Sequence, residues 1–409
     1  MAMYRRLFGL GVLSLWFAHL SAQSLTWLGV LPGGSVSRAS AVSSTGMVVG
    51  SAWNAQGQER AFLWSASVGM FDLGVLPGGT RSRALAIAAD GQTVVGIAVN
   101  AEGRDRAFRW TNTTGMVELG TLGGLRSGAT GVSANGTYIV GWAHTSSNAT
   151  HAFRWSSLTG MQDLGTLGGV SSLAYGVSGD GTTVVGVSNL PQGFERAFRW
   201  TTTGMQNLNT LGGTKSRALA VSANGQVIVG GSYRDQTQTW NAFRWEASTG
   251  IMGLPLLNGY WGSEALAVSC DGTVIVGRAY NPGEDPTAVR WIAGIGIQNL
   301  NSVYAGLLSP GSVLYEAIGI SPEGRYIVGT GYNALTNRSE AFLLDMGPTC
   351  TPHNGDVNRD GCVDDTDLLS LLFAFGQSGC GVGANDANCD GVVDDADLLI
   401  ALFHFGENC

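Results

Sequence analysis

The sequence predicts an all-β fold, a seven-bladed β-propeller of four-stranded repeats, followed by a small C-terminal module with two helices. Three observations support this prediction. A pentad of the type Arg-Ala-Phe-Arg-Trp recurs seven times, at a pitch of about 45 residues, and a repeated unit of this length buries its apolar faces only against its neighbours. The chain has 62 glycines but only 13% charged residues, which favours many tight turns. Residues 348–409 then become acidic and rich in cysteine.

The N-terminus, residues 1–22, has the pattern of an export signal. A basic start at residues 1–6 precedes an apolar stretch at residues 7–18, and Ser21-Ala22 provides small residues for cleavage. An uncleaved membrane anchor is the alternative, but the stretch is shorter than the ~20 apolar residues of a spanning helix. We expect a mature chain that is secreted, extracellular or on the cell surface, with no membrane span.

Charge is distributed unevenly along the expected mature chain. Residues 348–409 carry eleven acidic side chains and a single basic one, Arg359, whereas residues 23–347 carry equal numbers of both signs. The repeat region has no basic stripe, so nucleic acid is not an expected partner. We therefore divide the chain into a signal segment, a propeller at 23–347 and an acidic module at 348–409.

One repeat unit can be followed from Ala84 to Gly120. Short alternating or β-branched segments are separated by turns, of which Asp90-Gly91 is the clearest because glycine accepts positive φ. The strands that we expect in this unit are residues 84–88, 93–99, 106–110 and 116–120. Four short antiparallel strands in each repeat are the blade of a β-propeller.

The order of the strands predicts a closed ring. Each strand type occurs seven times, yet the array begins with a fourth strand at residues 25–29 and ends with a third strand at residues 340–345. The first strand would then complete the last blade and remove the exposed sheet edges. An open solenoid would require polar caps at both ends, and the sequence has none.

The units resemble the HAF-type extracellular repeats, named for the His/Arg-Ala-Phe of the third strand, which residues 151–153 carry verbatim. The resemblance covers about residues 25–346 and implies a secreted bacterial protein without implying any chemistry. The repeated aromatics are expected to pack between blades, since Phe108 and Trp110 lie on one face of a strand. A residue that recurs around the ring indicates the fold, because an active site occurs once.

Residues that break the repeat are the candidates for a binding site. Three places after the second-strand glycine, on the loop-bearing rim, the blades carry Trp53, Val99, His144, Asn189, Tyr233, Tyr280 and Tyr332. The aromatics and the histidine of this column would form a platform for sugar rings or peptide side chains, so we expect a glycan or peptide ligand. The alternative is that these side chains pack against their own variable loops.

A second column lies just before the first strand, near the mouth of the channel. Its members are Arg38, Arg83, Gly128, Leu173, Arg217, Glu264 and Glu316. Ring closure would make Glu316 a neighbour of Arg38 and Glu264 a neighbour of Arg217. Glycoside hydrolysis uses paired carboxylates, so Glu264 and Glu316 are the catalytic candidates. The alternative is a ring of Arg–Glu ion pairs, which adjacent arginines favour over a general acid.

The C-terminal segment contains two copies of a calcium-loop pattern. Oxygen-bearing side chains occur at loop positions 1, 3, 5, 9 and 12, with glycine at position 6 and a backbone carbonyl at position 7. The first loop uses Asp356, Asn358, Asp360, Cys362, Asp364 and Asp367. The second loop uses Asp386, Asn388, Asp390, Val392, Asp394 and Asp397. This spacing wraps hard oxygens around one ion, so we expect two Ca²⁺ ions.

Aspartate at position 12 and a single helix after each loop make this segment resemble a type I dockerin over about residues 354–406. The helices are expected at residues 365–375 and 395–405, each closed by a glycine. The resemblance implies that 348–409 docks onto a cohesin-like or cell-surface protein of a polysaccharide-degrading assembly.

The segment departs from the dockerin pattern in two places. Positions 10 and 11, usually hydroxyl residues, are Asp-Thr and Asp-Ala. The usual Lys-Arg of the helices is replaced by Leu372-Phe373 and Leu402-Phe403, so we expect apolar faces that pack on each other. Calcium binding is therefore better supported than cohesin binding.

Five cysteines crowd this module, namely Cys350, Cys362, Cys380, Cys389 and Cys409. An exported chain oxidises such cysteines, although their spacing does not determine the pairing. Our hypothesis is a Cys362–Cys389 bond between the loops, with a clasp from Cys350 to Cys380 or Cys409. Cys270 lies alone in a propeller turn and is expected to be free.

The sequence thus favours a secreted, non-catalytic binding or scaffold protein. The propeller rim would bind an extracellular ligand, and the calcium-dependent module would mediate attachment. A polysaccharide-degrading enzyme, or a subunit of such a complex, is one alternative, and a structural cell-surface component is another. No metalloprotease helix, nucleophile elbow or phosphate loop occurs in the sequence.

Overall fold

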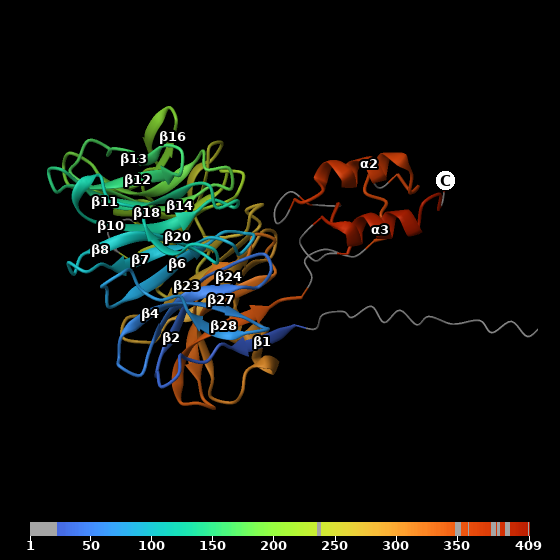
Figure 1. Cartoon of the computed structure of the whole chain (residues 1–409), viewed down its shortest axis with the longest axis horizontal. Helices are drawn as coiled ribbons and strands as arrows, with labels where there is room; N and C mark the ends of the chain where they lie inside the picture. The colour runs from blue at the N-terminus through green and yellow to red at the C-terminus, as the bar shows by residue number, and fades with distance from the viewer. Residues whose placement is uncertain are drawn as a thin grey trace, which may run out of the picture.

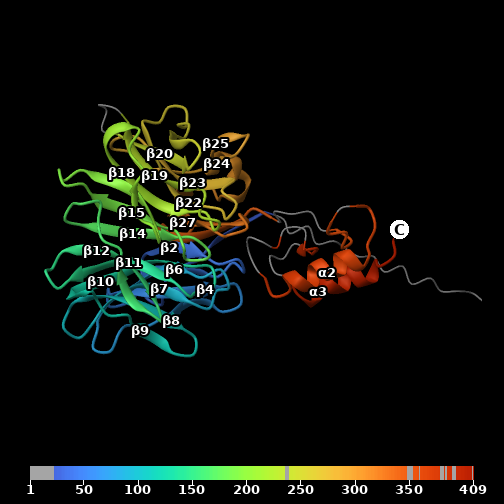
Figure 2. The ribbon, with the colours of Figure 1, turned by 90° about the horizontal axis from the view of Figure 1, so that it is seen from above.

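The computed structural model describes residues 23–234, 239–347, 353–358, 360–377, 382, 385–388, 393–407 and 409. The expected signal segment therefore lies outside the described residues. The propeller forms seven four-stranded antiparallel sheets around a central channel, with two helices to one side of it (Figures 1 and 2). The all-β, seven-bladed propeller expected from the sequence is confirmed.

Six blades pair their strands in chain order, and the seventh has the order β26-β27-β28-β1, with the strand that starts each repeat innermost. The innermost strands are β2 (Ser37–Val42), β6 (Ser82–Ile87), β10 (Gly123–Val132), β14 (Ser172–Val177), β18 (Gly212–Val221), β22 (Gly262–Val268) and β26 (Val313–Ile320). The second strands are β3 (Val48–Trp53), β7 (Val94–Val99), β11 (Ile139–Thr145), β15 (Val184–Asn189), β19 (Ile228–Arg234), β23 (Val274–Tyr280) and β27 (Tyr326–Asn333).

The outer half of each blade contains the pentad and the short fourth strand. The third strands are β4 (Glu59–Ser65), β8 (Asp105–Thr111), β12 (Thr150–Ser156), β16 (Glu195–Thr201), β20 (Trp240–Glu246), β24 (Thr287–Ile292) and β28 (Arg338–Asp345). The fourth strands are β5 (Gly69–Asp72), β9 (Gly115–Glu118), β13 (Gly160–Asp163), β17 (Gly204–Asn207), β21 (Gly250–Gly253), β25 (Gly296–Asn299) and β1 (Ser24–Trp27).

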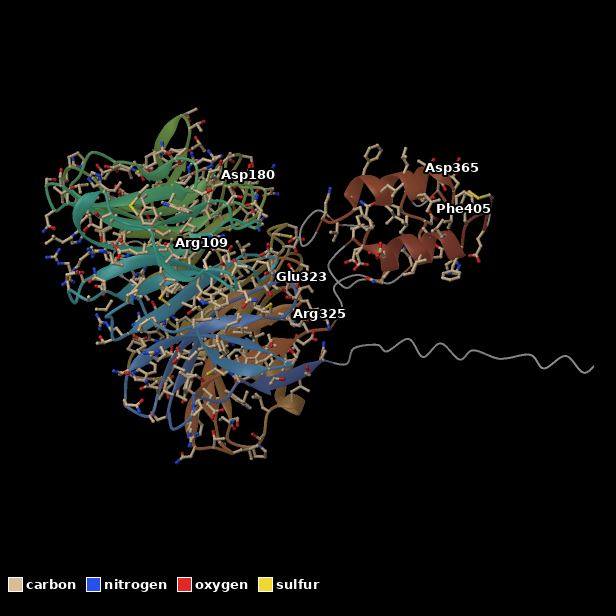
Figure 3. The ribbon with its side chains drawn as sticks, viewed as in Figure 1. Arg109, Asp180, Glu323, Arg325, Asp365 and Phe405 are labelled. Atoms are coloured by element: carbon tan, nitrogen blue, oxygen red, sulfur yellow. A yellow bond between two sulfur atoms is a disulfide. The ribbon has the colours of Figure 1, made fainter. Side chains whose placement is uncertain are left out.

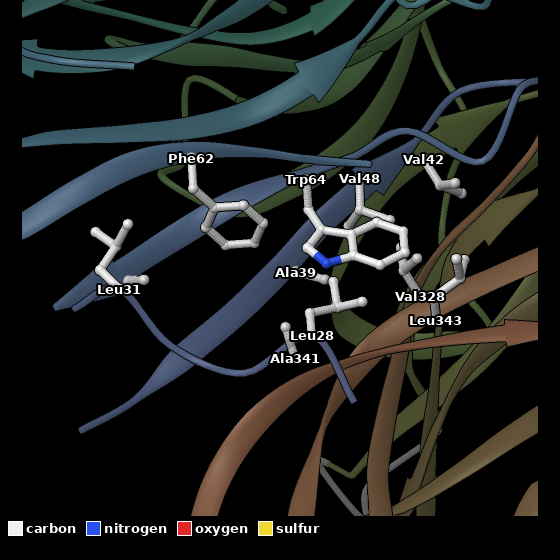
Figure 4. Close-up of a cluster of buried hydrophobic side chains, with 11 residues drawn as sticks. Leu28, Leu31, Ala39, Val42, Val48, Phe62, Trp64, Val328, Ala341 and Leu343 are labelled. Carbon is white, nitrogen blue, oxygen red and sulfur yellow. The ribbon is translucent and has the colours of Figure 1, made fainter. Parts of the chain in front are cut away.

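The ring closes through β1, which is the fourth strand of the last blade. It pairs antiparallel with β28, in the register that places Leu25 opposite Leu344. The innermost strands contact one another in cyclic order, and β26 contacts β2. Figure 4 shows the core at this junction, where Trp64 of the first blade lies in one cluster with Val328 and Leu343 of the last. The closure expected from the strand order is confirmed.

The repeated aromatics form the cores between blades. Phe108 and Trp110 are buried in a cluster with Val49 and Leu73 of the preceding blade. Each large aromatic contributes roughly 2–3 kcal/mol of burial free energy. The repeated glycine of the second strand is required by close packing, since a Cβ at Gly96 would lie 2.0 Å from the Arg83 carbonyl oxygen. Inter-blade packing of the pentad is thus confirmed.

The turn after the first strand also has the expected geometry. Gly91 has a φ of 75°, and the Asp90 carboxylate accepts a hydrogen bond from the Gln92 amide at 2.8 Å. Because the aspartate folds back on its own turn, the chain reverses within a few residues. Seven such turns surround one end of the channel.

The C-terminal helices are α2 (Asp365–Ala374) and α3 (Asp395–Phe403). Asp364 and Asp394 cap their N-termini, and both helices are followed by a glycine with positive φ. Their shared core contains Val363, Leu371, Ala374, Val382, Val393 and Ala401. Two short helices, α1 (Leu300–Val303) and η2 (Ala305–Leu307), connect the sixth and seventh blades.

Three expectations about the cysteines and the C-terminal helices are wrong. Cys362 is bonded to Cys409, not to Cys389. Cys270 is itself disulfide-bonded, whereas we expected it to be free, and the other three cysteines lie outside the described residues. The apolar faces do not pack on each other, because the side chains of Phe373 and Phe403 are 77% and 81% exposed.

No helix in the described part of the chain is long and apolar enough to cross a bilayer.

Candidate functional site

The channel mouth on the loop-bearing rim departs from seven-fold symmetry in one sector. Each residue of the column that begins with Arg38 is paired, in the strand register, with one residue of the second strand. In blade order these second-strand residues are Ser51, Ile97, Trp142, Val187, Gly231, Arg278 and Thr330. Only blade six places a charged residue here, and its partner across the strands is Glu264. Ladder neighbours lie within reach of long side chains, so the two groups meet.

Arg278 connects both predicted carboxylates in one chain of ion pairs. Its guanidinium contacts Glu264 at 2.6 Å and Glu316 at 3.0 Å. Arg217 of the neighbouring blade contacts the other oxygen of Glu264 at 3.0 Å. Burial alone would lower the pKa of Arg278, but Glu264 and then Glu316 raise it. The chain Arg217–Glu264–Arg278–Glu316 therefore carries two charges of each sign.

Glu264 is paired with its predicted neighbour Arg217. The strands of Glu316 and Arg38 are in contact as ring closure predicted, but the two side chains do not form an ion pair in the described structure. Glu316 is bound by Arg278, and the Arg38 guanidinium lies over the ring of Trp53, 5.5 Å from its centroid. Because β2 and β3 are paired strands of one blade, the contact with the Trp53 indole holds the Arg38 side chain within its own blade.

Trp240, at the start of β20, forms the aromatic wall beside this ion chain. The guanidinium of Arg217 lies 4.0 Å from its ring centroid, and Tyr233 meets it edge-on at 4.5 Å. Gly231 leaves the space for both neighbours, because a Cβ there would lie 3.0 Å from Trp240 and 3.4 Å from Glu264. Glycine at position 231 of blade five is therefore needed for this arrangement of side chains.

Tyr280 and Trp261 are neighbouring aromatic residues of blade six, joined by a backbone hydrogen bond. The Tyr280 hydroxyl donates to the Trp240 carbonyl oxygen at 3.3 Å, which joins the two blades. Burial, and then the charge of Glu264, raise the pKa of Tyr280 to about 12, so this hydroxyl remains protonated. The Trp261 amide donates to Asn281 Oδ1 at 3.1 Å, yet its side chain is 68% exposed.

The other members of the predicted aromatic platform bind within their own blades. His144 Nδ1 lies 3.0 Å from Asn148 Oδ1, and its ring lies 5.9 Å from that of Trp142. The Tyr332 hydroxyl donates to Asn337 at 2.5 Å. Of the five predicted platform residues, the structure brings Tyr233 and Tyr280 together through Trp240.

Two buried polar atoms at this mouth lack a hydrogen-bond partner among the described residues, namely Arg217 Nε and Thr330 Oγ1. Thr330 lies across the strand ladder from Glu316. A buried donor without a partner costs about 1–3 kcal/mol, so these two atoms lower the stability of this sector.

The channel itself encloses a cavity of about 910 Å³ toward the opposite end. Its wall includes Tyr175, Leu219 and Ile318 of the innermost strands, together with Asp180 and Glu323 of the turns. Figure 3 places Asp180 and Glu323 on the side of the propeller that faces α2 and α3. Val382 and Asp386 of the C-terminal segment also line this cavity.

The first predicted calcium loop is held by hydrogen bonds to its own acidic residues. Asp356 Oδ2 accepts the Gly361 amide at 3.0 Å, and Asp360 Oδ1 accepts the Cys362 amide at 2.9 Å. Asp367, at position 12, is fully buried and accepts the amides of Val357 and Asp364. Asp356 Oδ1 is buried and has no partner among the described residues.

The second loop repeats this pattern where it is described. Asp397 is fully buried and accepts the amides of Asn388 and Asp394. Asp390 and Val392 lie outside the described residues. In the described residues, no three His, Cys, Asp or Glu side chains gather as a metal site. The donors are all hard oxygens, and the unpartnered Asp356 Oδ1 is suited to a cation.

Helices α2 and α3 expose the same apolar side chains at corresponding positions. These are Leu369, Leu372 and Phe373 on the first helix with Phe375 just after it, and Leu399, Leu402 and Phe403 on the second with Phe405 just after it. All eight are at least 46% exposed. Grouped apolar side chains of this kind are typical of interaction surfaces.

Arg278, Trp240 and Trp261 were not predicted from the sequence. Arg278 could have been found by aligning the residue after each second-strand glycine, where blade six alone has a charge. Trp240 and Trp261 lie at the ends of loops whose lengths vary between blades, so no repeat column identifies them.

Comparison with known proteins confirms the fold. No protein-family model and no curated protein sequence matches the chain. The β-propeller domain of the Trilobed protease from Pyrococcus furiosus is similar with a TM-score of 0.51 and 10% identity, over 76% of this chain and 96% of that one. An oligogalacturonate lyase in complex with manganese gives a TM-score of 0.51 and 13% identity, over 78% and 92%.

TolB from Acinetobacter baumannii is also similar, with a TM-score of 0.42 and 12% identity, over 74% of this chain. The match spans 64% of the length of that TolB chain. The Pyrococcus propeller is described as having an open velcro topology, whereas β1 and β28 pair in the present chain.

Proposed function

We propose that this chain is a secreted, non-catalytic binding protein whose propeller holds an extracellular ligand on the rim of blades five to seven. The observation that carries the proposal is the ion chain through Arg278, with Trp240 against Arg217 and an exposed tryptophan, Trp261, at the start of blade six. Positions that repeat around the ring build the fold, so a site that occurs once is sought where the repeat is broken.

Binding is better supported than catalysis. Glu264 is 4% exposed in its side chain, and its two oxygens are held by Arg217 and Arg278. A general acid must approach the glycosidic oxygen, whereas both carboxylate oxygens of Glu264 are occupied by guanidinium groups. Glu316 is bound by the same Arg278. The polysaccharide-degrading alternative predicts that Glu264→Gln abolishes a measurable hydrolysis, and the binding function predicts no hydrolysis to lose.

The C-terminal module is proposed to bind two calcium ions and to attach the propeller to a partner. Asp356, Asn358, Asp360, Asp364 and Asp367, with the Cys362 carbonyl, would hold the first ion. The matching residues Asp386, Asn388, Asp390, Asp394 and Asp397, with the Val392 carbonyl, would hold the second. Bound calcium would neutralise the repelling carboxylates and order the loops.

The partner of this module is proposed to be a cohesin-like or other cell-surface protein. The exposed pairs Leu372-Phe373 and Leu402-Phe403 supply an apolar surface, and the eleven acidic residues of 348–409 favour a partner with basic groups around it. Secretion is supported by the basic-then-apolar residues 1–22 and by the Cys362–Cys409 disulfide, because such bonds persist in oxidising compartments.

The binding function is tested with a panel of immobilised oligosaccharides and peptides. Trp261→Ala and Arg278→Ala are expected to lose the ligand that the native chain binds. Phe71→Ala is the matched control, since Phe71 is an exposed aromatic of the outer strand β5. Equal binding by all three variants would exclude the rim of blades five to seven as the site.

A further inference from the structure

We infer that the ligand of this rim is an uncharged saccharide, and this inference rests on the proposed function. Three properties of the sector point to that class. The sector presents aromatic faces, its charges cancel, and its polar groups offer donors and acceptors side by side.

Two tryptophans belong to the sector, one held through its ring and one anchored through its backbone. Trp240 is held between Arg217, at 4.0 Å, and Tyr233, at 4.5 Å. Trp261 is held through its backbone amide by Asn281 and by the Tyr280 carbonyl oxygen, while most of its side chain remains exposed. A flat, rigid aromatic face loses little conformational entropy on binding and suits the C–H face of a sugar ring.

The charges of the sector leave no net charge for an ionic ligand. Arg217 and Arg278 are matched by Glu264 and Glu316 at 2.6–3.0 Å. An anionic ligand would have to compete with Glu264 for the same guanidinium groups, and a cationic ligand would have to displace one of them. Breaking a desolvated pair leaves a buried charge unpaired, so both charged classes are disfavoured.

The polar groups are arranged for hydroxyls. The side chains of Arg217 and Arg278 are about one-third exposed, and they alternate with carboxylates. Arg217 Nε and Thr330 Oγ1 are buried and have no partner among the described residues. A hydroxyl accepts from a guanidinium and donates to a carboxylate through one atom, whereas a peptide divides these roles between N–H and C=O. Vicinal hydroxyls therefore match an alternating Arg–Glu chain better than a peptide backbone does.

The second strands of blades two to four lack this combination. In blades two to four the corresponding second-strand residues are Ile97, Trp142 and Val187, and none of these side chains carries a charge. A hydroxyl-rich ligand would lose hydrogen bonds to water there without replacement, so we place it over blades five to seven.

The test is titration calorimetry of the full chain with matched hexasaccharides, one set of neutral hexoses and one set of uronates, and with a pooled peptide library. We expect neutral oligosaccharides alone to bind, with an affinity that is unchanged between about 0.1 M and 1 M salt, since screening acts on charged ligands. Trp261→Ala should weaken this binding about tenfold, the size of one lost stacking contact. Trp261→Phe should restore most of it, and Phe71→Ala should leave it unchanged.

The outcomes separate the ligand class from the site. Binding of a uronate or a peptide that Trp261→Ala abolishes would overturn the saccharide class and leave the rim site in place. Binding of a neutral saccharide that Trp261→Ala and Arg278→Ala leave unchanged would overturn the site. Circular dichroism of each variant shows whether a loss of binding is a loss of the fold.

Discussion

The amide of Cys270 donates a hydrogen bond to the carbonyl oxygen of Pro322, 2.9 Å away on the next blade. The same contact joins five other pairs of neighbouring turns, namely Ser44 to Ala89, Ala89 to Ala134, Ala134 to Gly179, Gly179 to Ala223 and Ala223 to Cys270. The ring would be completed by a bond from residue 322 to Ser44, but proline has no N–H to donate. The seam between the last and first blades therefore lacks the backbone hydrogen bond that the other six junctions have.

Glu323 lies at this seam, and its carboxylate group is buried there. Both of its carboxylate oxygens, and the hydroxyl oxygen of Ser44, are buried without a partner among the described residues. Burial raises the pKa of Glu323 above its ordinary value of 4.5, and the nearby Ser321, Ser44 and Arg325 offset only part of this effect. A protonated Glu323 would supply a donor that Pro322 lacks.

Glu323→Gln is expected to stabilise the protein at neutral pH. A group whose pKa is raised on folding contributes stability below its unfolded value, near 4.5, and loses it as the pH rises through the folded value. Glutamine keeps the shape and remains neutral, so the variant should exceed the native chain by on the order of 1 kcal/mol near neutral pH. The two should converge below pH 4.5.

The measurement is the melting temperature of both proteins across this pH range, with Glu102→Gln, an exposed loop residue, as the control. A Glu323→Gln variant that melts below the native chain at neutral pH would contradict a buried, proton-binding Glu323.

Arg278→Met is expected to destabilise the propeller by about 1–3 kcal/mol, because Glu264 then retains only Arg217. The double variant Arg278→Met, Glu264→Gln should recover part of this loss, because the most deeply buried carboxylate, Glu264, is then neutral, while Glu316 and Arg217 each lose an ion-pair partner. Urea unfolding of the two single variants and the double variant measures the coupling. Additive losses would mean that the two side chains do not act as a pair.

Phe342→Ala is expected to cost about 3–5 kcal/mol. Phe342 is fully buried and packs edge-on against Trp27 of β1, with 6.2 Å between ring centroids, so its loss opens the strand that closes the ring. Phe71→Ala, on the exposed outer strand, should change stability by less than about 0.5 kcal/mol. Similar losses in the two variants would show that closure through β1 contributes little to stability.

Calcium is expected to raise the melting temperature of the full chain. At a free calcium concentration about a hundredfold above Kd, binding adds about 2.7 kcal/mol to the free energy of unfolding. Asp356→Asn should remove one of two binding events in titration calorimetry, since position 1 supplies a charged ligand. Asp365→Asn is the control because position 10 is not a ligand position and Asp365 is exposed. If Asp356→Asn still shows two unchanged calcium-binding events, the proposed first loop is excluded as a calcium site.

The sequence predicted the fold more completely than the site, and particular residues show why. The offset between the first and last strand types required β1 to join β28, because the pattern of strands is a property of the chain itself. The partners of Glu316 and Cys362 depend on which side chains meet across blades, and no spacing records that. The position of the Trp240 side chain depends on the space left at Gly231, so it is set by a relation between two strands.

Hydrogen exchange of the full chain, with and without its best-binding ligand, tests the central claim that this ligand occupies the rim of blades five to seven. We predict slower exchange confined to the rim ends of β19, β20 and β23, and to residues 261–264. Protection of β7, β11 and β15 in blades two to four, with none over Arg278, would contradict the account.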